Sequence, residues 1–138
     1  MSMSLRNIMK RTNISSGSPF ESIAGFSRAV RVGNIISVAG TAPIAVDGST
    51  AAPGDVYGQT QRCLEIIRQA ITEAGGNIQN VVRTRIMLTD IARWKEAAKA
   101  HGEVFASIKP ACTLVEVSGL IKKDWLVEIE ADCILPTP

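Results

Sequence analysis

The sequence has few cysteines, little net charge and no long apolar run, and each shortage excludes a class of protein. The three cysteines, Cys63, Cys112 and Cys133, are unevenly spaced and predict no disulfide framework. The formal net charge is +2 and the basic residues are scattered, so nucleic acid is not an expected partner. No apolar run is long enough to span a bilayer, and no signal-peptide core is present. We therefore expect a cytoplasmic protein without a membrane partner.

The motifs of several common catalytic sites are also missing. There is no Gly-x-Gly-x-x-Gly loop and no Gly-x-x-x-x-Gly-Lys loop, which disfavours nucleotide-dependent chemistry. Histidine and cysteine residues do not cluster at metal-ligand spacing, so no metal site is predicted. The single histidine, His101, lies on the apolar stripe of a predicted helix, where packing is a better interpretation than catalysis. We expect no metal and no cofactor.

The chain of 138 residues is 46% hydrophobic, which suits one folded domain. Residues 1–25 are polar and rich in turn-forming residues. We expect an N-terminal arm over residues 1–20 and then a loop that leads into a domain of residues 21–138. The segment SRAVRVGNIISVAG (27–40) predicts two strands joined by a turn at Gly33-Asn34.

Apolar periodicity predicts two helices. The first spans residues 55–74 and ends at two glycines. Its apolar stripe consists of Val56, Cys63, Ile67, Ala70, Ile71 and Ala74. The second follows Asp90, a good helix N-cap. Its predicted inner face consists of Ile91, Trp94, Ala98, His101 and Phe105.

Alternating segments at 81–89, 111–117 and 126–134 predict three further strands. The resulting order is strand, strand, helix, strand, helix, strand, strand. The simplest packing of these elements is an α+β fold in which two helices cover one face of a single mixed sheet.

The predicted sheet face that points away from the helices is charged. Alternation places Arg83 and Arg85 on it, together with Glu128, Glu130 and Asp132. One interpretation is a face in contact with solvent. The other is a second buried face, formed by assembly, in which the opposite charges pair.

Two residues are chemical candidates. A cysteine nucleophile needs a nearby base or positive end that lowers its pKa. Cys112 begins a predicted strand and has no obvious partner of this kind in sequence, so a small buried side chain is favoured over a nucleophile. Glu128 lies in a strongly apolar strand. It either pairs with Arg83 or Arg85, or it is a buried acid suited to proton transfer. The residues alone leave both interpretations of Glu128 open.

Several segments together resemble the RidA family, also called YjgF or endoribonuclease L-PSP. They are GFSRAVRVGNIISVAG, YGQTQRCLEIIRQAITEAGG, VVRTRIMLTDI, KPACTLVEV and VEIEA. The resemblance covers about residues 20–135. It implies a chorismate-mutase-like fold and a homotrimer with a central barrel of strands and small-molecule pockets at the subunit interfaces. The best-known activity of the family is cofactor-free hydrolysis of reactive enamines and imines.

The resemblance also implies which residues line the pocket. The family motif PAR[ST] is PACT here, so Cys112 stands where the family has an arginine that clamps the substrate carboxylate. Phe26, Ala39 and Ala98 replace a tyrosine, a serine and an asparagine. Glu128 is retained and is the predicted catalytic residue. The predicted substrate-binding positions are Phe26, Ala39, Ala98, Cys112 and Thr113.

We therefore predict a RidA-type protein that acts as a hydrolase or deaminase on an imine, enamine or related metabolite other than the standard imino acids. A non-catalytic ligand-binding or regulatory trimer is the alternative. An endoribonuclease or translation inhibitor is the least favoured function, because the chain has one histidine and little positive charge. The sequence does not tell whether Arg28, Arg83 or Arg85 replaces the missing arginine.

Overall fold

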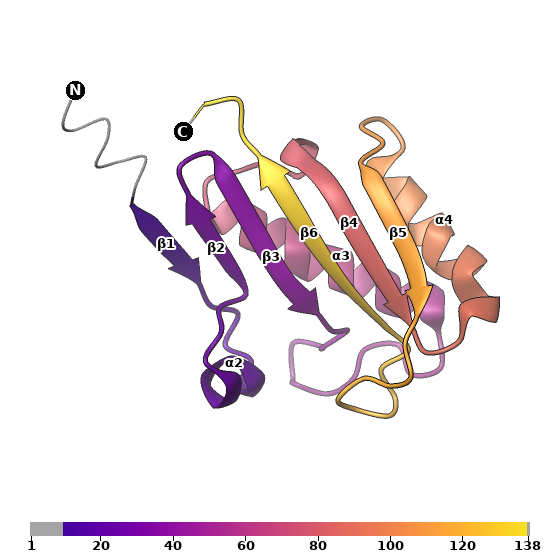
Figure 1. Cartoon of the computed structure of the whole chain (residues 1–138). Helices are drawn as coiled ribbons and strands as arrows, with labels where there is room; N and C mark the ends of the chain where they lie inside the picture. The colour runs from indigo at the N-terminus through magenta and orange to yellow at the C-terminus, as the bar shows by residue number, and fades with distance from the viewer. Residues whose placement is uncertain (1–9, 138) are drawn as a thin grey trace, which may run out of the picture.

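The computed structural model describes residues 10–137, in which six strands form one mixed sheet (Figure 1). The strands are β1 (Arg11–Ile14), β2 (Ala29–Val32), β3 (Ile35–Thr41), β4 (Val81–Leu88), β5 (Ala111–Glu116) and β6 (Val127–Ile134). Their order across the sheet is β1-β2-β3-β6-β4-β5. Strands β4 and β5 are parallel, and the other neighbours are antiparallel. The last strand of the chain therefore lies inside the sheet, between β3 and β4.

Helices α3 and α4 cover the same face of the sheet, as the sequence predicts (Figure 1). The helices are α2 (Pro19–Ala24), α3 (Val56–Glu73) and α4 (Trp94–Phe105), and the 3-10 turns are η1 (Ile78–Asn80) and η2 (Ile91–Arg93). The predicted α+β architecture is confirmed. No helix in residues 10–137 is long and apolar enough to cross a membrane.

Helix α3 forms where the apolar stripe predicts it. The Asp55 carboxylate accepts a hydrogen bond from the Gly58 backbone N–H and caps the first turn. The stripe buries Cys63, Ile67 and other side chains against the sheet. The chain leaves the helix through Gly75, whose φ of 87° is a conformation that favours glycine.

The predicted inner face of the second helix is partly wrong. Asp90 is an N-cap, as predicted, but it caps the 3-10 turn η2, and α4 begins only at Trp94. A 3-10 turn has fewer residues per turn than an α-helix, so it changes the phase of the apolar stripe. Ile91 and Trp94 are consequently exposed. The buried residues of α4 are Ala97, Ala100 and Phe105.

Part of the segment predicted as an arm and a loop has regular structure. Strand β1 pairs with β2, so that Ile14 lies opposite Ala29. Helix α2 begins after the N-cap Ser18 and ends at Gly25, which has a φ of 74°. Residues 1–9 of the predicted arm lie outside the described residues. The boundary between residues 20 and 21 stays a prediction.

The two faces of the sheet differ as the alternation predicts. The face under α3 and α4 is apolar, and side chains such as Ile36, Ile86 and Ile129 are completely buried there. The opposite face carries the Arg85–Glu130 ion pair. We call this the open face, because neither α3 nor α4 covers it (Figure 1).

Candidate functional site

A β-bulge interrupts the pairing of β3 with β6 at Ala39 and Gly40. Val38 lies opposite Ala131 and Thr41 lies opposite Ile129, so β3 has one residue more than β6 between these two pairs. The extra residue returns Thr41 to the helix-covered side, where it is buried. Bulges of this kind often redirect side chains beside functional sites.

Glu128 lies on β6 directly beside this bulge. A Cβ atom built on Gly40 would lie 3.3 Å from Glu128 Oε2, so the glycine leaves room for the carboxylate. Burial raises the pKa of the Glu128 carboxyl above its ordinary value, and the charge of Arg28 partly opposes this shift. Within residues 10–137, the carboxylate forms no ion pair. Glu128 is thus a partly buried acid that the chain leaves available.

Of the two interpretations of Glu128, the pairing with Arg83 or Arg85 is not found within residues 10–137. The register of β4 against β6 places Arg85 opposite Glu130, and these two residues form an ion pair. Arg83 Nη2 instead donates a hydrogen bond to Thr113 Oγ1 at 3.2 Å. Alternation predicts the shared face correctly, but the register decides which charges meet.

Arg28 is the cation whose charge acts on Glu128. Its side chain is buried, and Nη1 donates to the Gly40 carbonyl oxygen at 2.6 Å and to Thr41 Oγ1 at 3.1 Å. Nη2 lies 3.5 Å from Glu21 Oε2. Arg28 is thus bonded to the bulge on one side and to a carboxylate on the other.

Glu21, on α2, has a complete set of partners. Its carboxylate accepts hydrogen bonds from the Ser15 hydroxyl at 3.0 Å, from the Ser16 hydroxyl and from the Ser16 backbone N–H. Burial alone would raise the pKa of Glu21. The serine hydrogen bonds and the charge of Arg28 outweigh burial and lower the pKa below its ordinary value.

Two predicted pocket positions, Phe26 and Ala39, lie beside Arg28. The Arg28 Cζ atom is 5.5 Å from the centre of the Phe26 ring, which is partly exposed. The Ala39 backbone N–H donates to the Arg28 carbonyl oxygen at 2.9 Å. One chain therefore gathers Phe26, Ala39 and Glu128 around Arg28 and the bulge.

The other three predicted positions lie elsewhere in the chain. Cys112 pairs with the buried Thr84 across β5 and β4 and so points to the helix-covered side of the sheet. It is exposed, which contradicts the expected small buried side chain, because β5 is an edge strand with only one neighbour. Ala98 lies on α4, also on that side. Thr113 shares the open face with Glu128 but lies two strands away.

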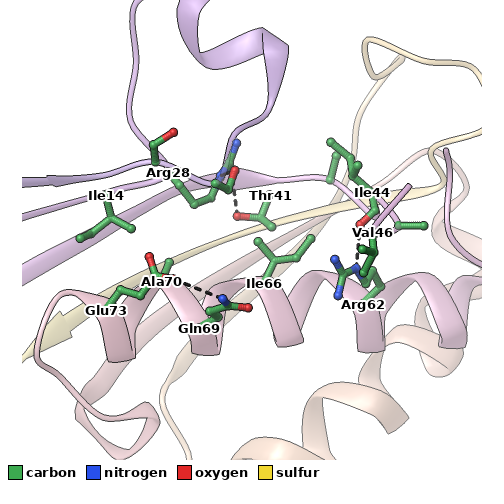
Figure 2. A pocket seen from close by; sticks show the side chains of 14 residues that line it. Ile14, Arg28, Thr41, Ile44, Val46, Arg62, Ile66, Gln69, Ala70 and Glu73 are labelled. Carbon is green, nitrogen blue, oxygen red and sulfur yellow. Dashed lines mark hydrogen bonds between the residues drawn. The ribbon is translucent and has the colours of Figure 1, made fainter. Parts of the chain in front are cut away.

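A cavity of about 320 Å³ lies on the helix-covered side, between α3 and the ends of β1 and β3 (Figure 2). Ile14, Ile44, Ile66 and Ala70 form much of its apolar wall. Arg62, whose Nε donates to the Ile44 carbonyl oxygen, and Glu73 also line it. Arg28 lines this cavity, whereas Glu128 does not.

His101 has the surroundings of a packing residue, as predicted. Its Nε2 atom lies 2.8 Å from Thr84 Oγ1, and its ring lies 4.6 Å from the Phe105 ring. Burial lowers the pKa of His101 below its ordinary value, so the neutral form is favoured. His101 is therefore poorly placed to act on a ligand at the open face.

Comparison with known proteins defines the class to which this fold and site belong. Residues 16–135 match the model of the family described as endoribonuclease L-PSP. The chain is 38% identical over 109 residues to a RutC family protein of Pyrococcus abyssi, which covers 79% of this chain and 85% of that protein. It is 44% identical to Rv2704 of Mycobacterium tuberculosis, a member of the YjgF/YER057c/UK114 family. That crystal structure superposes with a TM-score of 0.83, over 91% of this chain and 100% of that chain.

A Rid family protein of unknown function from Yersinia pestis, YyfA, is 29% identical, with a TM-score of 0.81 over 91% of this chain and 100% of that chain. These matches extend over nearly the whole described sheet and both covering helices. The chain belongs to the RidA family.

Proposed function

We propose that this protein is a cofactor-free hydrolase of an imine, enamine or related metabolite other than the standard imino acids, and that Glu128 is its catalytic residue. The observation that carries the proposal is the partly buried Glu128 carboxylate, which forms no ion pair within residues 10–137. Burying an ionisable group without a partner is costly. Its position beside a bulge is therefore better explained by a ligand than by the fold.

The chemistry needs one group that both accepts and donates a proton. Glu128 would accept a proton from water as the water oxygen bonds to the C=N carbon. It would return that proton to the nitrogen, which gives a carbinolamine. Glu128 would then accept the hydroxyl proton of the carbinolamine and deliver it to the nitrogen as the C–N bond breaks, so that a carbonyl compound and an amine or ammonia leave. Water and imine are the only reactants, and no electron is gained or lost. A carboxyl pKa raised by burial suits this double role.

The charges around the site argue against a carboxylate-bearing substrate. Arg28 is buried against Glu21, Arg85 is held in an ion pair, and Arg83 is bonded to Thr113. Cys112 offers a thiol where the family has a guanidinium, and a thiol cannot form a bidentate contact with a carboxylate. We propose that the loss of the active-site arginine has removed the clamp for standard imino acids.

We also propose that three copies assemble through the open face. This face exposes Val32, Ile35 and Ile134, at 41%, 51% and 52%, in addition to its charged residues. Large apolar side chains gathered on one face favour an interface. In such a trimer, Thr113 on the open face of β5 in one copy would approach the Glu128 site of the next. Cys112, which points to the other face, would reach that site around the free edge of β5. The pockets would then lie between subunits.

A non-catalytic ligand-binding or regulatory trimer is the second candidate. It is favoured by the replacement of polar family positions with Phe26 and Ala39, which makes the wall beside Glu128 apolar. An endoribonuclease is the least favoured function, because His101 is bonded to Thr84 and lies on the other side of the sheet from Glu128.

The proposed function is tested with two imines. One is N-benzylidenemethylamine, which has no carboxylate and whose hydrolysis is followed by ultraviolet absorbance. The other is the imine that an amino-acid oxidase releases from leucine, followed by trapping with semicarbazide. We expect the protein to accelerate hydrolysis of the first imine, and Glu128→Gln to abolish the acceleration. If neither imine is hydrolysed faster than it is spontaneously, the hydrolase proposal fails and the ligand-binding alternative takes its place.

A further inference from the structure

We propose that Glu21 and Arg28 form a buried pair that positions the Ala39–Gly40 bulge beside Glu128 and controls how much positive charge reaches the Glu128 carboxylate. Arg28 is then a positioning residue and not a substrate clamp. The inference rests on the proposed function, because it assigns these two residues a role in the same site.

Arg28 holds the bulge from two directions. Its backbone carbonyl oxygen accepts a hydrogen bond from the Ala39 N–H at 2.9 Å. Its Nη1 atom donates to the Gly40 carbonyl oxygen at 2.6 Å and to Thr41 Oγ1 at 3.1 Å. One residue therefore contacts three successive residues of β3. Because Gly40 lies against the Glu128 carboxylate, fixing the bulge also fixes the wall beside that carboxylate.

Glu21 determines whether Arg28 presents a free positive charge. Both side chains are 6% exposed, and Arg28 Nη2 lies 3.5 Å from Glu21 Oε2. Salt screens the attraction between these two charges only weakly, because both side chains are buried. Glu21 is the only carboxylate within residues 10–137 that forms an ion pair with Arg28, so removing its negative charge would leave Arg28 unpaired in this part of the chain. Glu21 thus limits the stabilisation that ionised Glu128 receives.

The other charged and titratable groups around Glu128 leave this role to Arg28. On β4, Arg85 is tied to Glu130. From α3, the buried Cys63 thiol is close enough for Glu128 to raise the pKa of that thiol further. Arg28 is the cation whose charge lowers the pKa of Glu128 against the effect of burial.

The test is a ligand-free titration of the Glu128 carboxyl carbon by nuclear magnetic resonance, with the signal assigned by its loss in Glu128→Gln. In Glu21→Gln, we expect the Glu128 pKa to fall, because Arg28 is no longer neutralised. In Arg28→Gln, we expect it to rise, because the cation is gone. The matched control is Glu65→Gln, which removes an exposed carboxylate that is paired with Arg62, and should leave the titration unchanged.

An unchanged Glu128 pKa in folded Glu21→Gln would overturn the inference. Glu21→Gln keeps the size and hydrogen-bonding capacity of the side chain, so it decides the matter even where Arg28→Gln does not fold. If N-benzylidenemethylamine is hydrolysed, its pH–rate profile should shift in the same direction as the titration. A shifted titration without any hydrolysis would contradict the proposed function and leave the role of the Glu21–Arg28 pair intact.

Discussion

The charge of Arg28 acts on two carboxylates, Glu21 and Glu128, whose surroundings differ. Glu21 is deeply buried, accepts hydrogen bonds from two serines and has a lowered pKa. Glu128 is partly buried, has no ion-pair partner within residues 10–137 and has a raised pKa. Burial raises the pKa of both carboxyls, and hydrogen bonds to the charged form outweigh burial only at Glu21. We infer that Glu21 serves the fold and that Glu128 serves a ligand.

The largest expected effect comes from removing the carboxylate that serves the fold. Glu21→Ala should leave Arg28 buried without its anion and destabilise the protein by about 3–5 kcal/mol. Thermal or urea unfolding, monitored by circular dichroism, measures this loss. The exposed Glu65→Ala is the control and should change stability by less than about 0.5 kcal/mol. Equal destabilisation by Glu128→Ala would remove the contrast between the two carboxylates.

The same contrast predicts opposite pH dependence. The pKa of Glu21 is lowered, so the stability that it contributes is present above its ordinary value of 4.5 and is lost as the pH falls through the folded-state pKa. Glu21→Gln should therefore flatten the acid side of the stability curve. Melting temperatures across the acid range measure this change, and an unaltered acid limb in Glu21→Gln would contradict it.

The next effect concerns Cys112, the position at which we propose that the family's carboxylate-clamping arginine is missing. Wild-type protein should hydrolyse the leucine imine little faster than it reacts spontaneously, because a lost charge-assisted bidentate contact costs about 2–4 kcal/mol, or roughly two to three decades in rate. In Cys112→Arg, carboxylates derived from leucine should inhibit the hydrolysis of N-benzylidenemethylamine, because the new guanidinium can bind them. The control Cys112→Met adds length without charge and should not. Strong wild-type turnover of the leucine imine would show that another cation clamps the carboxylate.

A smaller effect tests the open face. Light scattering should give a trimer, and Ile35→Glu should dissociate it, since burying a side chain of this size contributes about 1.5–3 kcal/mol and the new carboxylate adds a desolvation cost. Val46 is the control, because it is 95% exposed and lies away from the open face on the cavity wall. Val46→Glu should therefore stay trimeric. A stable wild-type monomer would remove both the assembly and the pockets between subunits.

Local sequence patterns predicted most of the helices and strands and the two faces of the sheet. The features that the sequence did not predict depend on contacts between residues far apart in the chain. The capped stripe of α3 and the alternation in β4 and β6 are properties of neighbouring residues, so the sequence carried them directly. The partner of Arg85 depends on strand register, which alternation does not specify. The exposure of Cys112 depends on β5 being an edge strand.

Within the candidate site, Glu128 was predicted, but its surroundings were not. Glu21 comes from a segment that was expected to be a loop, whereas Arg28 comes from the segment predicted as two strands. Their contact depends on α2, which was not predicted. Gly40 carried the one available signal, because a glycine inside a strand often marks a bulge. The resemblance that identified the other pocket positions concerns an assembled trimer, so a single chain gathers only some of them.

The most direct test of the account is Glu128→Gln, measured for stability and for turnover of N-benzylidenemethylamine. The folded-state pKa of Glu128 is raised, so the stability that Glu128 itself contributes is fully present below its ordinary value of 4.5 and is lost as the pH rises through the raised pKa. At pH values above the raised pKa, Glu128→Gln should therefore leave the melting temperature unchanged or raise it. Turnover should fall to the spontaneous rate. A clear drop in melting temperature with turnover unchanged would show that Glu128 serves the fold and would contradict the account.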